Sequence, residues 1–172
     1  MSIARIGILT ISDRASRGEY EDKGGPAIHA WFTRVLTTQW QPVAIVIPDE
    51  QPEIEAALRQ LSDVEKCCLI VTTGGTGLGP RDVTPEATRE AIDYEAPGLA
   101  EAMRAEGLKH TPMAMLSRAV AGVRGRTLIV NLPGNPEGVR EWLEALSPLL
   151  IHAFEMIEGG GHEHESLRAS RS

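Results

Sequence analysis

The sequence predicts an α/β fold in which helices cover a mostly parallel sheet. Short apolar runs alternate along the chain with segments whose apolar side chains recur at helical spacing. Strand–helix–strand units of this kind favour right-handed crossovers, and these produce a parallel sheet. A length of 172 residues fits one domain with a core that needs no disulfide or structural metal.

The first half of the chain predicts three strands and two helices. Nearly continuous apolar runs at residues 5–12, 42–48 and 67–73 are typical of strands in a covered sheet. Apolar residues on one face predict helices over residues 26–37 and 51–62. The first strand is expected to lead into a polar, glycine-containing loop.

The second half predicts further helices and at least one long strand. Helices are expected at residues 84–93 and 98–108, and a strand at residues 127–132 follows one or two shorter strands and a turn. The chain then predicts one helix with Pro136 near its start and a second helix after Pro148, because proline is tolerated in a first helical turn but interrupts a helix interior.

Composition argues against nucleic acid as a partner. Lys and Arg total 17 against 24 Asp and Glu, which gives a formal net charge of −7, and aromatic residues make up 4% of the chain. A duplex-binding surface needs a basic stripe to neutralise phosphates, and single-strand binding uses aromatic platforms. Neither feature is present in this sequence.

Nothing in the sequence predicts secretion or membrane insertion. The start of the chain lacks the apolar stretch of a signal peptide, and no apolar run reaches the ~18 residues of a membrane span. The adjacent Cys67 and Cys68 are poorly placed to bridge each other and fall in an apolar run. We therefore expect a cytoplasmic protein with one domain over residues 1–158 and a flexible tail over residues 159–172.

The stretch "TTGGTGLGPRDVTPE" (residues 72–86) is the strongest signal of a binding site. Glycines allow a loop to adopt positive φ angles and to present a concave array of N–H donors, which suits phosphate. The loop lacks the Gly-Lys-Ser/Thr of a P-loop, and prolines interrupt the dinucleotide-binding pattern. A glycine-rich turn without any ligand is the alternative. The predicted phosphate-binding residues are Thr73, Gly74, Gly75, Thr76 and Gly77.

Two acids are candidates for a magnesium site. Asp49 and Asp82 lie in loops that follow predicted strands, and ligands of open parallel sheets bind beyond the carboxyl ends of the strands. Mg²⁺ is commonly held by one or two carboxylates together with phosphate oxygens. For Asp49 the alternative is capping of the next helix, because acids are common at helix starts.

Two further motifs carry weaker signals. In "NLPGNP", Asn135 is placed to cap the following helix, and Asn131 offers an amide that can both donate and accept. The sequence "HEHE" at residues 162–165 could chelate a metal, but no other ligand lies at a fixed spacing from it.

Together, "ISDRASRGEYEDKGGP", "IPDE", "TTGGTGLGPRDVTPE", "LSR" and "LPGNP" resemble the MogA/MoaB family of molybdenum-cofactor biosynthesis proteins, which are similar to the G domain of gephyrin. The likeness spans residues 5–158. It implies a three-layer α/β/α fold with a mostly parallel sheet, usually trimeric, that binds molybdopterin and Mg-ATP. It also implies transfer of AMP to the terminal phosphate of molybdopterin with release of pyrophosphate.

The same resemblance assigns roles to individual residues. Asp49 and Asp82 match the two important acids of the family, which are expected to be catalytic and to hold Mg²⁺, and the glycine loop matches the nucleotide-phosphate site. The residues expected at the substrate and pocket edge are Ser12, Asp13, Ser117, Arg118, Asn131, Pro133 and Gly134.

Alternatives remain open at the level of the sequence. A short segment before the tail resembles the MoaB-like members, so a non-catalytic protein that binds molybdopterin or passes it to a molybdate-inserting partner is the second reading. A hydrolase like the competence-damage proteins would need a second catalytic domain, for which we expect this chain to be too short. Trp31, Trp40 and Trp142 suggest apolar surface that a homotrimer would cover.

Overall fold

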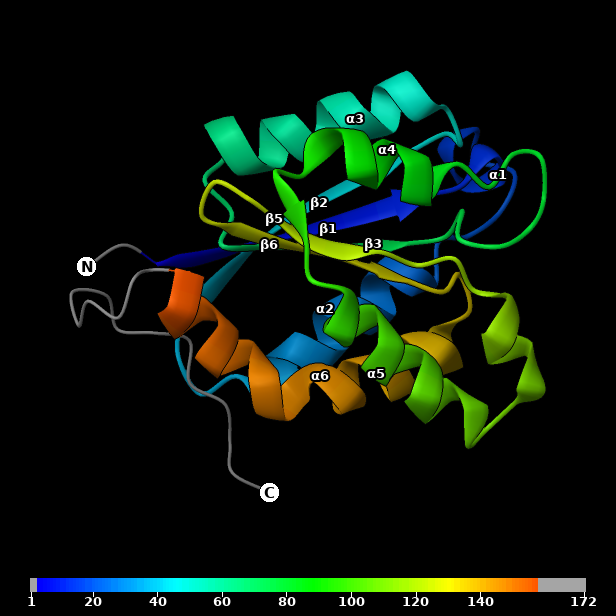
Figure 1. The fold of residues 1–172 in the computed structure, drawn as a ribbon. Helices are drawn as coiled ribbons and strands as arrows, with labels where there is room; N and C mark the ends of the chain where they lie inside the picture. The colour runs from blue at the N-terminus through cyan, green and yellow to red at the C-terminus, as the bar shows by residue number, and fades with distance from the viewer. Residues whose placement is uncertain (1–2, 158–172) are drawn as a thin grey trace.

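A computed structural model of the chain describes residues 3–157 (Figure 1). The predicted tail at residues 159–172, with its "HEHE" sequence, lies outside the described residues. Within them, no helix is long and apolar enough to cross a membrane.

A six-stranded, mostly parallel sheet forms the centre of the molecule, in the order β2-β1-β3-β6-β5-β4. The four strands β1, β2, β3 and β6 are parallel, whereas β5 runs antiparallel to β6 and β4 antiparallel to β5. The strand order reverses between β1 and β3, which is the position where ligands bind in sheets of this class. The strands are β1 (Ala4–Ile11), β2 (Trp40–Ile47), β3 (Leu69–Thr73), β4 (Tyr94–Glu95), β5 (Ala121–Arg124) and β6 (Thr127–Leu132).

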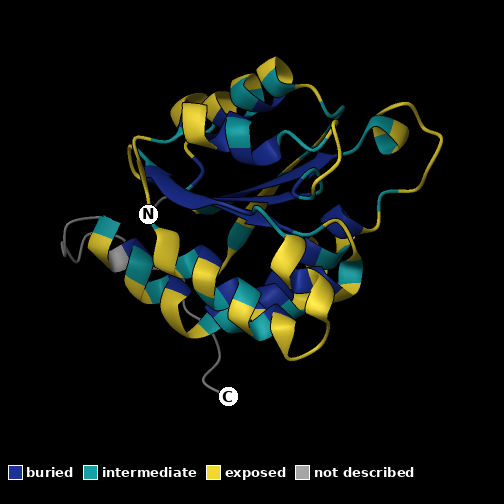
Figure 2. Ribbon diagram, turned by 45° about the vertical axis from the view of Figure 1, so that its right-hand side comes forward, coloured by how far each residue is buried: buried dark blue, intermediate teal, exposed yellow. Residues whose placement is uncertain are grey.

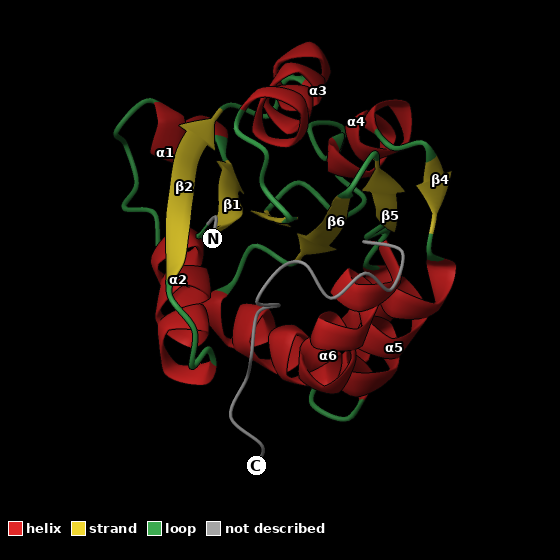
Figure 3. Ribbon diagram, turned by 90° about the vertical axis from the view of Figure 1, so that its left-hand side faces the viewer, coloured by secondary structure: helices red, strands yellow, loops and turns green. Residues whose placement is uncertain are grey.

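Helices cover both faces of the sheet, so the three-layer α/β/α expectation is confirmed (Figures 1 and 3). One face carries α3 (Gln51–Arg59), which continues into the π-helical turn η1 (Gln60–Val64), and α4 (Thr84–Ala91). The other carries α2 (Gly24–Val35), α5 (Pro97–Leu108) and α6 (Pro136–Ile157). Two apolar cores result, one on each side of the sheet.

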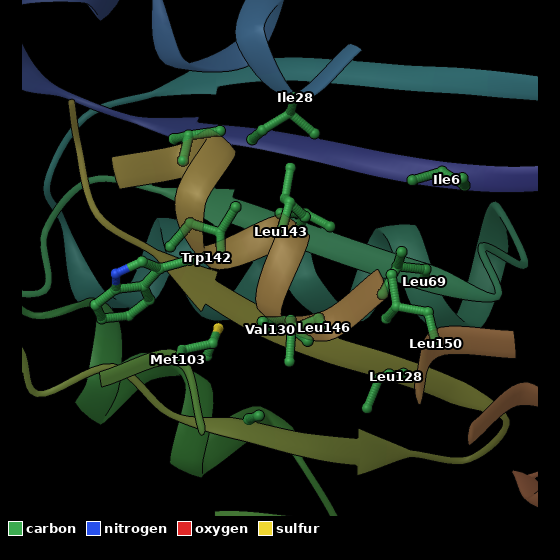
Figure 4. Packing of buried hydrophobic residues seen from close by; sticks show 14 of the residues in the cluster. Ile6, Ile28, Leu69, Met103, Leu128, Val130, Trp142, Leu143, Leu146 and Leu150 are labelled. Atoms are coloured by element: carbon green, nitrogen blue, oxygen red, sulfur yellow. The ribbon is translucent and has the colours of Figure 1, made fainter. Parts of the chain in front are cut away.

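The larger core lies between the sheet and α2, α5 and α6. Alternate residues of the strands point toward these helices, and Figure 4 shows Leu143 and Leu146 of α6 packed among Ile28 of α2 and Val130 of β6. The central strands β3 and β6 are buried along their whole length, as Figure 2 shows in dark blue. This rigid centre fixes the positions of the loops that leave its carboxyl edge.

The expectation of two final helices is wrong, because α6 runs unbroken through Pro148. Proline lacks the N–H that would bond four residues back, and this normally favours a break. Here Leu146, Leu150 and Phe154 lie on both sides of the proline and are buried in the same core. Their burial keeps the two halves in one helix, an example of packing that overrides a local preference.

Three smaller differences concern the loops and the surface. The loop after β1 contains a short helix, α1 (Asp13–Ser16), capped by the Ser12 hydroxyl, which accepts from the Ala15 N–H at 3.2 Å. The two-residue strand β4 and the 3₁₀ helix η2 (Pro112–Leu116) were not expected. Trp31 and Trp142 are 3% exposed, so they belong to the core and give no support for a trimer.

Candidate functional site

Four loops meet at the carboxyl edge of the parallel strands and enclose a pocket of about 410 Å³. The pocket lies at the strand-order reversal, between the ends of β1 and β3, where Thr10 pairs with Thr73. Ligand pockets of open parallel sheets are expected at this position, beyond the carboxyl ends of the strands. The lining residues used below are Thr10, Ser12, Asp22, Lys23, Gly24, Asp49, Thr73, Gly74, Gly75, Asp82 and Gly134.

The glycine loop leaves β3 with two consecutive residues in the left-handed region. Gly74 has φ +99° and Gly75 has φ +68°. At Gly74 an added Cβ would lie 2.2 Å from the Ile11 carbonyl oxygen, so no other residue fits. Among residues 3–157 the backbone N–H groups of Gly75, Thr76 and Gly77 have no hydrogen-bond partner, which leaves three donors available to an anion.

Asp49 follows β2 and faces Asp13, the first residue of α1, in the loop after β1. The Asp49 carboxylate accepts from the Asp13 N–H at 2.8 Å, and the Asp13 carboxylate accepts from the Asp49 N–H at 3.0 Å. The capping alternative for Asp49 fails, because the cap position of α3 is Glu50 and carries no side-chain hydrogen bond. Asp49 therefore links two loops at the pocket and does not cap its own helix.

Asp82 closes the far end of the glycine loop. Its carboxylate accepts from the Gly79 N–H at 2.8 Å, and its own N–H donates to the Gly79 carbonyl at 3.0 Å. Gly77 and Gly79 leave room for this carboxylate, since an added Cβ would lie 3.0 and 2.7 Å from its Oδ2. Asp82 and Asp49 both line the pocket, so the structure brings the two predicted acids to one site.

The electrostatics of the pocket favour a cation. Burial raises the pKa of the Asp49 carboxyl, and the charges of Asp13 and Asp82 raise it further, although the Asp13 N–H opposes them. The described residues contain no cluster of three or more potential metal ligands. Two carboxylates are nevertheless what Mg²⁺ requires when phosphate oxygens complete its coordination, so the residues present fit that ion.

Arg81, at the tip of the glycine loop, is tied to the neighbouring loops. Its guanidinium donates to both carboxylate oxygens of Asp13 at 3.0 Å and to Glu50 at 2.7 Å. This pairing lowers the pKa of Asp13. Arg81 lies outside the pocket lining, so in this structure it connects the loops.

Arg118 supports the glycine loop from outside the pocket. Its guanidinium donates to the Gly77 carbonyl at 2.8 Å and the Asp82 carbonyl at 2.5 Å, and it pairs with Glu86. Its backbone N–H also donates to the Thr76 carbonyl at 2.9 Å. The structure thus places Arg118, and its neighbour Ser117, behind the loop and not in the pocket lining.

Asn131 was predicted at the pocket edge, but the structure does not place it there. Its side chain is fully buried, accepts from the Val120 N–H at 3.1 Å and donates to Thr72 and Thr88 at 3.1 and 3.0 Å. The amide oxygen and both amide hydrogens are therefore engaged within the protein. The Asn131 side chain holds β3, β6 and α4 together beneath the site. Pro133 likewise lies outside the lining, where its carbonyl accepts from Thr73 at 2.7 Å.

Of the other predicted residues, Ser12, Thr73, Gly74, Gly75 and Gly134 line the pocket, whereas Thr76 and Gly77 continue the loop beyond it. Sequence reasoning missed Asp22 and Lys23 as pocket residues. They precede the paired glycines that open α2, and this "DKGG" stretch was a signal that could have identified them. Asn135 caps α6 as predicted, accepting from the Gly138 N–H at 2.7 Å.

Comparison with known proteins agrees with this geometry. The family model described as a probable molybdopterin binding domain matches residues 7–152. A protein of Escherichia coli K12 named molybdopterin adenylyltransferase is 49% identical over 146 residues, which cover 85% of this chain and 75% of that protein. One of the same name from Helicobacter pylori J99 is 43% identical over 92% of this chain and 90% of its own length.

Solved structures support the same relationship. The crystal structure of the molybdopterin biosynthesis enzyme MoaB from Thermus thermophilus is 54% identical and superposes with a TM-score of 0.83. The match covers 91% of this chain and 98% of that one. The fold therefore has a counterpart in a solved protein that is related in sequence over most of this chain.

Proposed function

This chain belongs to the family of probable molybdopterin-binding domains, and we propose that it is a molybdopterin adenylyltransferase of molybdenum cofactor biosynthesis. It would transfer AMP from Mg-ATP to the terminal phosphate of molybdopterin. The observation that carries the proposal is the pocket at the strand-order reversal, where Gly75, whose N–H has no hydrogen-bond partner among residues 3–157, lies beside the carboxylate of Asp49, and Asp82 lines the same pocket.

The chain's own groups account for binding and orientation in this reaction. The Gly75 N–H would bind nucleotide phosphate in the pocket, and the N–H groups of Thr76 and Gly77 would extend this array where the loop continues past the lining. Thr84 and Arg118 anchor the loop and hold these donors in place before the substrate arrives. Thr84 does so by donating to the Gly74 carbonyl at 2.9 Å. Preorganised donors of this kind are the main source of rate enhancement in phosphoryl and nucleotidyl transfer.

Asp49 and Asp82 would hold the magnesium ion. When bound, Mg²⁺ neutralises phosphate charge and acts as a Lewis acid on the phosphate oxygens. The reaction needs no nucleophilic side chain, because an oxygen of the acceptor phosphate attacks the α-phosphorus. The bond from that phosphorus to the β-phosphate oxygen then breaks, and pyrophosphate leaves.

Two further parts of the proposal concern assembly and location. We propose a homotrimer, for which the exposed Met113, Met115 and Leu116 of η2 offer apolar surface, and light scattering at micromolar concentration tests it. We also propose a cytoplasmic location, which agrees with the Cys67 thiol being 2% exposed and packed in the core without a disulfide.

The test is pyrophosphate release with Mg-ATP, measured with and without molybdopterin. Asp82→Asn removes one pocket charge, and Glu53→Gln, on the exposed side of α3, is the matched acid-to-amide control. We expect release that depends on molybdopterin, is lost in Asp82→Asn and persists in Glu53→Gln. Tight binding of molybdopterin without release would instead identify the non-catalytic carrier, which could pass its ligand to a molybdate-inserting protein.

A further inference from the structure

Carboxylates outnumber cations in the lining of the pocket. Asp22, Asp49 and Asp82 contribute three acids, and Lys23 is the one basic residue that lines it among residues 3–157. Two phosphate-bearing substrates can bind in a pocket with this excess of negative charge only if cations neutralise part of that charge. A magnesium ion, which Asp49 and Asp82 would hold, would offset the charge of one substrate, and the other substrate would still lack a counter-charge.

Lys23 is available for that role. Within the described part of the chain its ammonium makes no ion pair or hydrogen bond, although three carboxylates line the same pocket. By contrast, Arg81 and Arg118 are committed to Asp13, Glu50 and Glu86. Among residues 3–157, Lys23 is thus the cation of the pocket lining that no carboxylate pairs with.

The fold holds Lys23 next to the glycine loop. The following residue, Gly24, packs so closely on Thr73 that an added Cβ would lie 2.6 Å from the threonine hydroxyl oxygen. The start of α2 therefore lies against the end of β3, where the glycine loop begins. Asp22 fixes this arrangement, because its carboxylate accepts from the Thr10 hydroxyl at 2.8 Å and from the Gly25 N–H at 3.0 Å.

We propose that Lys23 binds the phosphate monoester of the acceptor and makes the enzyme specific for a phosphorylated acceptor. This inference rests on the proposed function. The Gly75 N–H and the carboxylates of Asp49 and Asp82 serve the nucleotide, whereas Lys23 lines the pocket from the start of α2, where the next residue, Gly24, packs on Thr73. A lysine ammonium is a compact charge with three donors on a flexible stem, which suits a phosphate that must approach a second phosphate in order to react.

The positive charge of Lys23 would also reduce the electrostatic repulsion between the two reacting phosphates. The attacking group is a dianion that approaches an already anionic α-phosphate within a pocket that contains carboxylates. At such distances like charges repel strongly in a partly desolvated site. An ammonium on the acceptor side offsets this repulsion without competing for the metal site.

Steady-state kinetics of Lys23→Gln test the proposal. A hydrogen bond to a charged group contributes about 1.5–3 kcal/mol, so we expect the KM for molybdopterin to rise about 10- to 100-fold. The KM for ATP should stay within about two-fold of the wild type. Lys23→Arg, which keeps the charge, should recover most of the loss, and Lys109→Gln at the end of α5 is the lysine control away from the pocket.

Two results would overturn the proposal. One is an unchanged KM for molybdopterin in Lys23→Gln; the other is a rise in the KM for ATP alone, which would assign Lys23 to the nucleotide. If the wild type releases no pyrophosphate, the proposed function fails separately, and calorimetric titration of molybdopterin into wild type and Lys23→Gln still decides the role of Lys23. Equal affinity of the two proteins would refute it.

Discussion

Asp13 and Asp49 bind each other's backbone: each carboxylate accepts a hydrogen bond from the other residue's N–H, at 2.8 and 3.0 Å. The pair joins the loops after β1 and β2, two neighbouring parallel strands. Burial raises the pKa of the Asp49 carboxyl in the pocket lining, and the neighbouring charge of Asp13, which lies outside that lining and pairs with Arg81, raises it further. The arrangement is therefore built for a ligand or an ion and not for stability alone.

Asp49→Asn should separate these two roles. The amide oxygen still accepts from the Asp13 N–H, whereas the charge that would bind magnesium is gone. We expect pyrophosphate release to fall about 100- to 1,000-fold, because a bound metal contributes several kcal/mol to charge stabilisation. Asp49→Ala should lose the same activity and in addition the link between the loops. Full activity in Asp49→Asn would exclude this carboxylate from the metal site.

The raised pKa of Asp49 predicts how stability depends on pH. Burial is the main cause, and the folded protein therefore holds the Asp49 proton to a higher pH than the unfolded chain does. The folded state loses stability as the pH rises through this window. Thermal unfolding of Asp49→Asn should give a higher midpoint than the wild type at neutral pH, and the difference should vanish below the pKa of Asp49. A constant difference at every pH would contradict this assignment.

Gly74→Ala tests the turn that aims the glycine loop. The added Cβ would lie 2.2 Å from the Ile11 carbonyl oxygen at a φ of +99°, so the loop must move or the fold must absorb the strain. We expect a loss of about 1–3 kcal/mol in the free energy of unfolding together with loss of activity. Gly98→Ala, in α5, is the control, because no atom lies within 4 Å of its added Cβ. It should be neutral or stabilising by about 0.5–1 kcal/mol.

The sequence predicted the layers and the location of the candidate site, because both follow from local patterns. The alternation of strands and helices placed the loops at one sheet edge, and the glycine-rich stretch identified the donor loop. Whether an individual polar side chain faces the pocket or the core was harder to predict from the sequence. Asn131 was expected to face the ligand, yet it is fully buried under contacts with Thr72, Thr88 and Val120, which are distant in sequence or lie on other elements. Pro148 shows the same limit for a helix, where core packing decides the outcome.

Asn131→Ala should therefore act on stability more than on substrate contact. Truncation leaves the Val120 N–H and two buried threonine hydroxyls without their partner, and each unsatisfied buried group costs about 1–3 kcal/mol. We expect chemical denaturation to show a loss of about 2–4 kcal/mol, while the KM for molybdopterin in the folded fraction changes little. A large rise in that KM without loss of stability would restore the earlier assignment at the pocket edge.

Arg118→Lys distinguishes a loop support from a substrate contact. A lysine cannot reach Gly77, Asp82 and Glu86 together, because it lacks the planar fork of the guanidinium. We expect faster amide hydrogen exchange over residues 74–82 and a KM for ATP raised about ten-fold, the cost of roughly one lost hydrogen bond. Arg89→Lys, in the exposed pair with Glu95, should leave both unchanged. If activity fell while exchange in the loop stayed at the wild-type rate, Arg118 would have to act on the substrate directly, and the guanidinium would need to leave its present partners when the ligand binds.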